Sequence, residues 1–187
     1  MDIFIYISVF AVVIIGLIAL RNRLLSFKGQ SARDYEGLGP SFDPREHLNG
    51  RLICDGVIFG PTGRVTSRFR ALMEGEWDGD HGVLHEEFAY DSGTKQTRAW
   101  HLILGDDGRF VADAEDIVGR GAGEISGPAV RLRYRIILPY EAGGHKLDVV
   151  DWMYLCESGT IINRSQFTKF GVRVAELVAT IRPESPG

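Results

Sequence analysis

The sequence is poor in cysteine: its 187 residues include only two, Cys54 and Cys156. Two thiols are too few for a disulfide framework or for a thiolate zinc site, so each is expected to behave as a small buried hydrophobe. A disulfide between the two stays open, because both lie in predicted strands whose separation the sequence does not give. Neither a disulfide-rich nor a zinc-finger class fits this chain.

A basic surplus is also missing. The chain has 21 lysines and arginines against 25 acidic residues, for a net charge of -4. Binding to a phosphate backbone needs a basic surface, so no nucleic-acid partner is predicted. Proline is scarce at 7 residues while glycine is abundant at 23, a balance typical of many tight turns between strands. The length fits one domain with an appendage.

Motifs for catalysis or for metal binding are absent. His81 and His85 are four residues apart, but Gly82 and the strand pattern around it remove the helical face that a zinc pair needs. The glycine run 119–123 is not followed by a helix start, so it is expected to form a bulge or barrel bend rather than a phosphate loop. No histidine accompanies a nucleophile motif. We therefore predict no metal and no cofactor, and leave open whether the chain is an enzyme.

Residues 3–20 form a run without any charge, long enough to cross a hydrocarbon core as a helix. A cleavable signal peptide is the alternative. The only early charge is Asp2, which gives no basic start, and no small-x-small cleavage site precedes Arg21. Residues 1–21 are therefore predicted to be a retained transmembrane anchor.

Positive charges follow the anchor closely, at Arg21, Arg23 and Lys28. The positive-inside bias places this flank, and the domain after it, in the cytoplasm. Residues 22–40 carry mixed charge and several glycines without apolar periodicity, so they are predicted to be a tether. The folded domain is expected at 41–184, with a short tail at 185–187.

The rest of the chain has the pattern of an all-β domain. A short helix is expected first, with Asp43 as its cap, Pro44 in its first turn and Gly50 beyond its end. Turn signals then separate strand-like runs at 51–59, 65–77, 83–90, 95–104, 110–118, 129–138, 146–156, 160–170 and 172–181. No long helical pattern interrupts these runs. This predicts an antiparallel up-and-down β-barrel of about 8–10 strands, which leaves no open sheet edge.

Polar and aromatic residues are densest at 148–154. Alternation places Asp151 among apolar neighbours on the buried face, so its carboxylate needs a partner, for which Arg98, Arg164 and Lys169 are candidates. Arg131, Arg133 and Arg135 repeat along one strand face. They either bind anionic lipid headgroups or form a solvated outer face, and we favour the outer face.

Five short motifs between residues 77 and 171 point to a family. WDG at 77–79, EEFAYDSG at 86–93, DWMYL at 151–155, INR at 162–164 and KFG at 169–171 resemble the bacterial family catalogued as domain of unknown function 3833. The resemblance implies a calycin-like barrel, of the lipocalin type, with an internal cavity. It points to a set of candidate ligand-binding residues without assigned roles: Glu86, Tyr90, Arg98, Trp100, Asp116, Asp151, Trp152, Tyr154, Asn163, Arg164 and Lys169.

Many members of that family look like exported lipoproteins with an acylated cysteine. This chain has no cysteine before Cys54. The family likeness implies a periplasmic domain and the flanking charges a cytoplasmic one, at the bacterial inner membrane in either case.

Three functions follow as hypotheses. The first is a membrane-anchored barrel that binds a hydrophobic or lipid-like ligand, such as a fatty acyl chain, with Arg98, Asp151, Asn163 and Arg164 orienting its polar end. The second is an enzyme acting on a lipid-like substrate, with Asp151 or Glu86 as general acid or base. The third is a structural or assembly partner in a membrane complex, with a fully packed interior. The sequence does not indicate an oligomeric state.

Overall fold

The computed structural model describes residues 2–24 and 26–184. The predicted tail at 185–187 lies outside these residues. The chain divides into two compact units, Met1–Asp34 and Tyr35–Gly187. The second unit contains the barrel and begins earlier than the domain start expected at residue 41.

The first unit contains the apolar helix α1 (Asp2–Leu24) and the 3-10 turn η1 (Phe27–Gly29), and a second turn, η2 (Ala32–Tyr35), reaches the boundary. Within α1, Ile3–Arg21 has a mean hydropathy of 3.0, and none of it is buried against the protein. It is long and apolar enough to cross a bilayer. A signal sequence at this place would have the same length and composition, so the helix is compatible with either.

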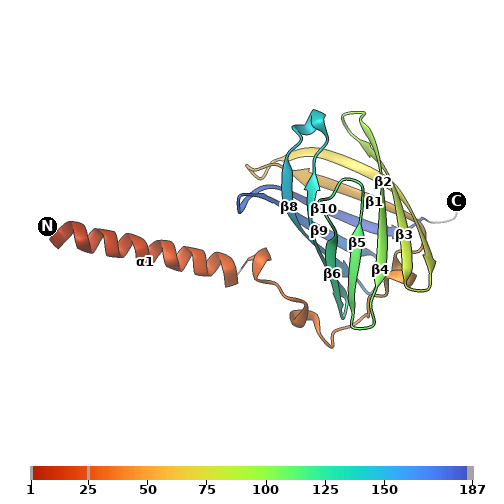
Figure 1. Cartoon of the computed structure of the whole chain (residues 1–187), viewed down its shortest axis with the longest axis horizontal. Helices are drawn as coiled ribbons and strands as arrows, with labels where there is room; N and C mark the ends of the chain where they lie inside the picture. Colours follow the sequence, from red (N-terminus) through yellow and green to blue (C-terminus); the bar gives the residue numbers. More distant parts are fainter. Residues whose placement is uncertain (1, 25, 185–187) are drawn as a thin grey trace. The chain divides into compact units, whose positions relative to one another are not determined.

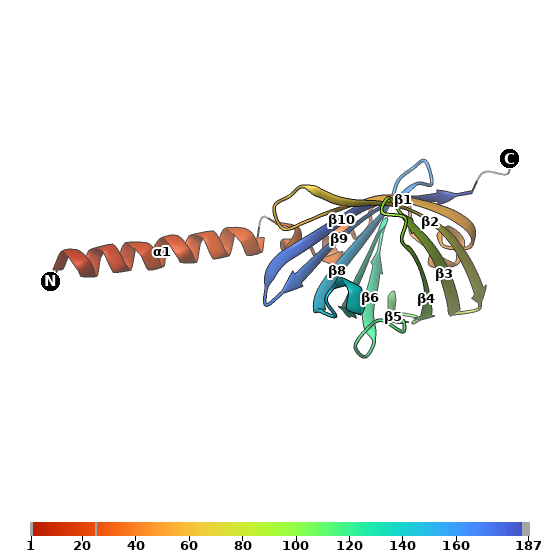
Figure 2. The ribbon, with the colours of Figure 1, turned by 90° about the horizontal axis from the view of Figure 1, so that it is seen from above.

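The second unit is a closed barrel of antiparallel strands, and Figure 1 and Figure 2 show it from two directions. Each strand pairs with its neighbours in the sequence, and β1 pairs with β10 to close the ring. The strands are β1 (Gly50–Phe59), β2 (Val65–Asp78), β3 (His81–Tyr90), β4 (Lys95–Leu104), β5 (Arg109–Asp113), β6 (Gly121–Ser126), β7 (Ala129–Ile137), β8 (Lys146–Leu155), β9 (Ile161–Lys169) and β10 (Val172–Pro183). A 3-10 turn, η3 (Tyr140–Ala142), lies between β7 and β8. The predicted all-β antiparallel barrel is confirmed.

One stretch differs from the strand prediction. The run expected at 110–118 leaves the sheet after Asp113, and beyond it an isolated bridge joins Ile117 to Ile136 of β7. The end of the glycine run 119–123, which was expected to form a bend, instead begins the strand β6. A Cβ on Gly123 would occupy the place of the Phe110 ring, so glycine lets this large ring fill the interior. The glycines of β6 therefore serve close packing within a strand.

Buried and exposed side chains alternate along the strands, and the buried ones form the core of the barrel. Along β2, Phe69, Ala71 and Met73 are buried while the residues between them are exposed, and Leu132 and Ile136 are buried along β7. Both patterns agree with the alternation in the sequence. The residues that point inward from the strands thus decide what the barrel interior contains.

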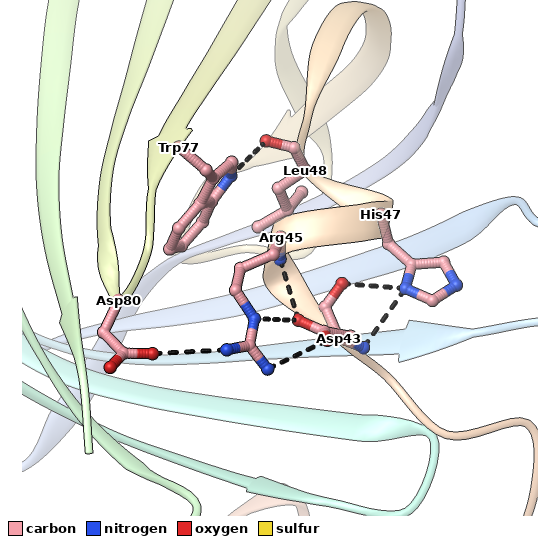
Figure 3. Close-up of polar contacts among 6 residues, drawn as sticks. All are labelled: Asp43, Arg45, His47, Leu48, Trp77 and Asp80. Atoms are coloured by element: carbon pink, nitrogen blue, oxygen red, sulfur yellow. Dashed lines mark hydrogen bonds and ion pairs between the residues drawn. The ribbon is translucent and has the colours of Figure 1, made fainter. Parts of the chain in front are cut away.

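A short helix closes one end of the barrel. In α2 (Pro44–His47), Asp43 caps the N-terminus by accepting a hydrogen bond from the Arg45 backbone N–H at 2.9 Å, as predicted. Figure 3 shows how the helix is fixed: Arg45 forms an ion pair with Asp80 at 3.2 Å, and the Trp77 indole N–H donates to the Leu48 carbonyl at 3.1 Å. Pro44 and Leu48 line a cavity inside the barrel, so α2 acts as its floor.

The segment before α2 packs on the outer wall. The Tyr35 ring lies 5.4 Å from that of Trp152 and 5.6 Å from that of Tyr154, measured between centroids. Phe42 then donates its backbone N–H to the Gly127 carbonyl at 2.9 Å. The end of the stretch expected to be a tether is therefore part of the barrel unit.

Candidate functional site

The barrel encloses a cavity of about 210 Å³, here called the inner cavity. A second cavity of about 90 Å³ lies above α2, and Glu86, Trp100, Asp151 and Asn163 line both. Most of the lining is aliphatic or aromatic. Into it project the side chains that we call the inner polar cluster: Glu86, Arg98, Asp116, Tyr134, Asp151, Asn163 and Ser165.

Strand register explains why these side chains meet. Glu86 and Arg98 are direct partners across β3 and β4, and Asp151 and Ser165 are direct partners across β8 and β9. Each lies an even number of residues from a buried neighbour, so all four point inward. Asp116 reaches the cluster from the segment that leaves the sheet after β5.

Arg98 is the cation of the cluster. Its Nη2 lies 2.9 Å from Asp116 Oδ1, and their side chains are only 12% and 24% exposed. The guanidinium carbon lies 3.9 Å from the Trp100 ring centroid and 5.5 Å from that of Tyr134. Burial lowers the pKa of Arg98, but Tyr134, Asp116 and Glu86 outweigh it and the pKa is raised, so the group stays charged. A cation stacked and paired in this way is held in one position.

Asp151 is held by β9. It accepts hydrogen bonds from the Ser165 hydroxyl at 2.8 Å and from the Asn163 amide. Burial raises the pKa of Asp151, while these two hydrogen bonds and the charge of Arg98 act in the opposite direction. The carboxyl is thus fixed in orientation and easier to protonate than an ordinary aspartate.

Glu86 stands opposite Arg98 and faces the cavity. Among the residues that the structure describes, none donates a hydrogen bond to its carboxyl. Burial raises the pKa of Glu86 from its ordinary value of 4.5 to about 7; Arg98 lowers it, and Asp151 and Asp116 raise it further. The group therefore changes charge near neutral pH.

The Glu86→Gln variant should be stabilised relative to wild type at pH 8 but not at pH 5. In the folded protein Glu86 keeps its proton up to about pH 7, whereas the unfolded chain releases it near 4.5. The free energy of unfolding of the wild type therefore falls across this window, by up to about 3 kcal/mol from this group. Urea denaturation of both proteins at the two pH values measures the difference. Glu87→Gln, on the exposed face of β3, is the control and should show no such change; an equal pH dependence in wild type and Glu86→Gln would contradict the assignment.

The barrel wall has a side opening next to this cluster. Only His101–Leu104 of β4 pair with β5, so the first half of β4 faces the loop after β5 instead of a strand. A surface cavity of about 420 Å³ lies there, with His85, Glu87, His101 and Glu115 around it. Glu86, Gln96, Arg98 and Asp116 line both this opening and the inner cavity. The Arg98–Asp116 ion pair therefore spans the passage between them.

The structure brings most, but not all, of the sequence-predicted residues together. Seven line the inner cavity: Glu86, Tyr90, Arg98, Trp100, Asp116, Asp151 and Asn163. The other four, Trp152, Tyr154, Arg164 and Lys169, do not. Arg164 forms an ion pair with Glu176 at 2.6 Å, and Lys169 Nζ lies 3.0 Å from His145 Nδ1.

The prediction grouped residues that are adjacent in the sequence, whereas the cavity takes alternate residues of each strand. Trp152 and Arg164 follow Asp151 and Asn163 directly, so alternation turns them to the outer face. Neither Arg164 nor Lys169 is the partner of Asp151; Asn163 and Ser165 hold it. Counting two residues on from Asn163 finds Ser165, and counting two on from the buried Leu132 finds Tyr134.

The cysteines and the arginines of β7 lie outside the inner polar cluster. Cys54 and Cys156 are both free thiols, and burial, with Glu86 nearby, raises the pKa of Cys54 to about 12. Arg131 and Arg135 form ion pairs with Glu124 and with Asp148, as on a paired outer face. Within residues 2–24 and 26–184, no cluster of three or more histidine, cysteine or acidic side chains is arranged to hold a metal ion.

Comparisons with solved structures agree on the fold. A protein of unknown function from the DUF3598 family of Nostoc punctiforme PCC 73102 matches with a TM-score of 0.54 and 10% identity, over 78% of this chain and 51% of that one. This chain thus spans about half the length of that protein. Rv2717c from M. tuberculosis matches with a TM-score of 0.55 and 14% identity, over 79% and 99%. At such identities the likeness is one of fold alone.

No curated protein matches this chain in sequence. The family described as "Protein of unknown function (DUF3833)" matches residues 22–183, a range that includes every strand of the barrel. The motifs around Asp151 predicted this family, and the chain belongs to it.

Proposed function

We propose that the barrel binds a small, largely apolar ligand in the inner cavity, with the inner polar cluster orienting the polar end of that ligand. The observation that carries the proposal is a partly enclosed, mainly apolar cavity into which a few polar groups project beside an opening in the wall. Binding sites for small molecules have this composition. The opening past Arg98 and Asp116 offers a route to the interior.

The cavity volume limits the ligand. About 210 Å³, with about 90 Å³ more above α2, is at or below the lower end of the roughly 300–1,000 Å³ usual for ligand pockets. A short acyl chain or a small ring compound fits this space better than a full-length fatty acid. The same two cavities argue against a purely structural barrel, for which a fully packed interior was expected.

Fluorescence of 1-aminoanthracene tests the proposal. This neutral probe should bind the full chain in lipid nanodiscs saturably, above the signal of empty nanodiscs. Leu177→Trp adds bulk to the inner cavity and should weaken probe binding at least tenfold. Leu72→Trp, on the exposed face of β2, is the matched control and should bind as wild type. No saturable binding by the wild type, or equal binding by Leu177→Trp, would overturn the proposal.

A catalytic function is the second candidate, and the state of Glu86 favours it. A carboxyl with a pKa of about 7 that faces a cavity suits general acid–base catalysis. If a small amphipathic compound is turned over, Glu86→Gln should abolish the reaction. Turnover that survives in both Glu86→Gln and Asp151→Asn would exclude these two carboxyls from the role.

We further propose that α1 is a retained single-pass anchor in the bacterial inner membrane. Its length and hydropathy support this. Reporter fusions placed after Glu184 distinguish the two orientations: a fluorescent protein reports a cytoplasmic barrel and alkaline phosphatase a periplasmic one. Release of a mature barrel without α1 into the soluble fraction would instead identify a signal sequence.

A further inference from the structure

We infer that the polar end of the ligand is a cation, of the amine or ammonium class, rather than a carboxylate. This inference rests on the proposed function and names the substrate class for the same cavity. Four sets of side chains carry it: those of the inner cavity, of the cavity above α2, of the side opening and of the aromatic wall.

Acidic groups dominate the inner cavity. Glu86, Asp116 and Asp151 line it, whereas Arg98 is the only basic side chain among the described residues that do so. Arg98 is already taken, since it pairs with Asp116 and lies over the Trp100 ring. Glu86 and Asp151 are influenced by the charge of Arg98, which lowers the pKa of each, but among the described residues neither forms an ion pair with a basic side chain. A buried charge lacking a counter-charge favours a ligand that supplies one.

The neighbouring spaces repeat this charge pattern. The cavity above α2 is lined by Glu86 and Asp151, and by no basic residue among those that the structure describes. Around the side opening, Glu87 and Glu115 add two more carboxylates outside the wall. With Glu86 and Asp116, four carboxyl groups surround the opening against the single guanidinium of Arg98. An excess of one sign raises the local concentration of the opposite charge, so a cation is drawn towards the passage.

Aromatic rings supply the second element that recognises a cation. Phe88 and Tyr90 stack with centroids 6.1 Å apart, and Phe69 lies 5.4 Å from Phe88. All three line the inner cavity: Phe88 and Tyr90 lie on β3 with Glu86, and Phe69 lies on the neighbouring β2. Ring faces beside carboxylates bind ammonium groups through the ring quadrupole, as the Arg98 guanidinium already does at Trp100. This wall can therefore take a cationic head and an apolar chain together.

A carboxylate ligand meets the opposite situation. To bind Arg98, whose Nε and Nη2 make no hydrogen bond, it would have to share the guanidinium with Asp116 and lie in the same cavity as Glu86 and Asp151. A ligand carboxylate and the protein carboxylates that share this small cavity would repel one another strongly, because little water screens them there. A fatty acid head is thus poorly matched to the inner polar cluster, although its chain would suit the apolar lining.

Three probes with one alkyl chain separate the possibilities. Octylamine, octanol and octanoate are compared as competitors of 1-aminoanthracene, on the full chain in nanodiscs at pH 8, with empty nanodiscs correcting for partition into lipid. Octylamine should compete at least tenfold better than octanol, and octanoate worse than octanol. In the Glu86→Gln/Asp151→Asn double variant the ratio of octylamine to octanol affinity should fall at least tenfold. Both changes preserve side-chain size, and a thermal melt verifies that the variant is folded.

The pH dependence provides a second readout. Glu86 is faced by Arg98 from β4, Asp151 from β8, Tyr134 from β7, Cys54 from β1 and Asp116 from the loop after β5. From pH 8 to pH 6 Glu86 takes up a proton while octylamine stays charged, so octylamine affinity should fall severalfold and octanol affinity should not. Octanoate or octanol competing as well as octylamine would overturn this inference and leave the proposed function standing. Absence of 1-aminoanthracene binding by the wild type would overturn both.

Discussion

Replacing Arg98 with methionine should lower the free energy of unfolding by about 3–5 kcal/mol at pH 8, the usual cost of removing one partner of a buried charge pair. Methionine keeps much of the length of the side chain but leaves Asp116, Glu86 and Asp151 without a cation inside the barrel. The loss should be smaller at pH 5.5, because Glu86, with its pKa near 7, is then neutral. Urea denaturation followed by tryptophan fluorescence at the two pH values measures both effects.

A matched control is available on the same barrel. Arg68 pairs with Asp91 at 3.0 Å, but the side chains are 71% and 37% exposed. Arg68→Met should therefore cost less than about 1 kcal/mol, as is typical of surface ion pairs. If Arg98→Met were no more destabilising than Arg68→Met, the description of Arg98 as the cation of the inner polar cluster would be wrong.

The Trp152→Ala variant should lose about 3–5 kcal/mol of stability, the range found for deleting a large buried aromatic side chain. Trp152 is only 1% exposed, although it lies on the outer face of β8, because Tyr35 and Tyr154 pack against it. Trp152→Phe keeps part of this packing and should lose about half as much. Chemical denaturation measures both, and Tyr140→Ala, at a side chain that is 92% exposed, should change stability by less than about 0.5 kcal/mol.

The conservative variant also tests where the site lies. Trp152→Phe should bind 1-aminoanthracene with wild-type affinity, since the ring points away from the inner cavity. A large loss of binding in a folded Trp152→Phe protein would move the site to the outer wall and contradict the assignment to the interior.

Alternation made most of the barrel predictable, and the family motifs supplied the candidate residues, seven of which line the inner cavity. Turn signals and a period of two marked most strands, and the same period placed Asp151 correctly on the inner face. β6 was missed because three of its first four residues are small and carry no strand preference; tertiary packing against Phe110 makes it a strand.

Asp116 shows what alternation cannot predict. Its approach to Arg98 depends on the chain leaving the sheet after Asp113, a choice fixed by the whole barrel and not by local composition. The side opening has the same origin, since it exists only where β4 lacks a strand partner. Trp152 and Arg164 do not line the inner cavity for a simpler reason: adjacent residues on a strand face opposite sides of the sheet.

The pairing of β1 with β10 also determines when this protein can fold. The first strand of the barrel completes its ladder with the last strand, which ends at Pro183, so the ring closes only after β10 has left the ribosome. Until then the free edge of β1 is open to pairing with other chains. A message truncated before β10 would therefore yield an aggregating product rather than a smaller working barrel.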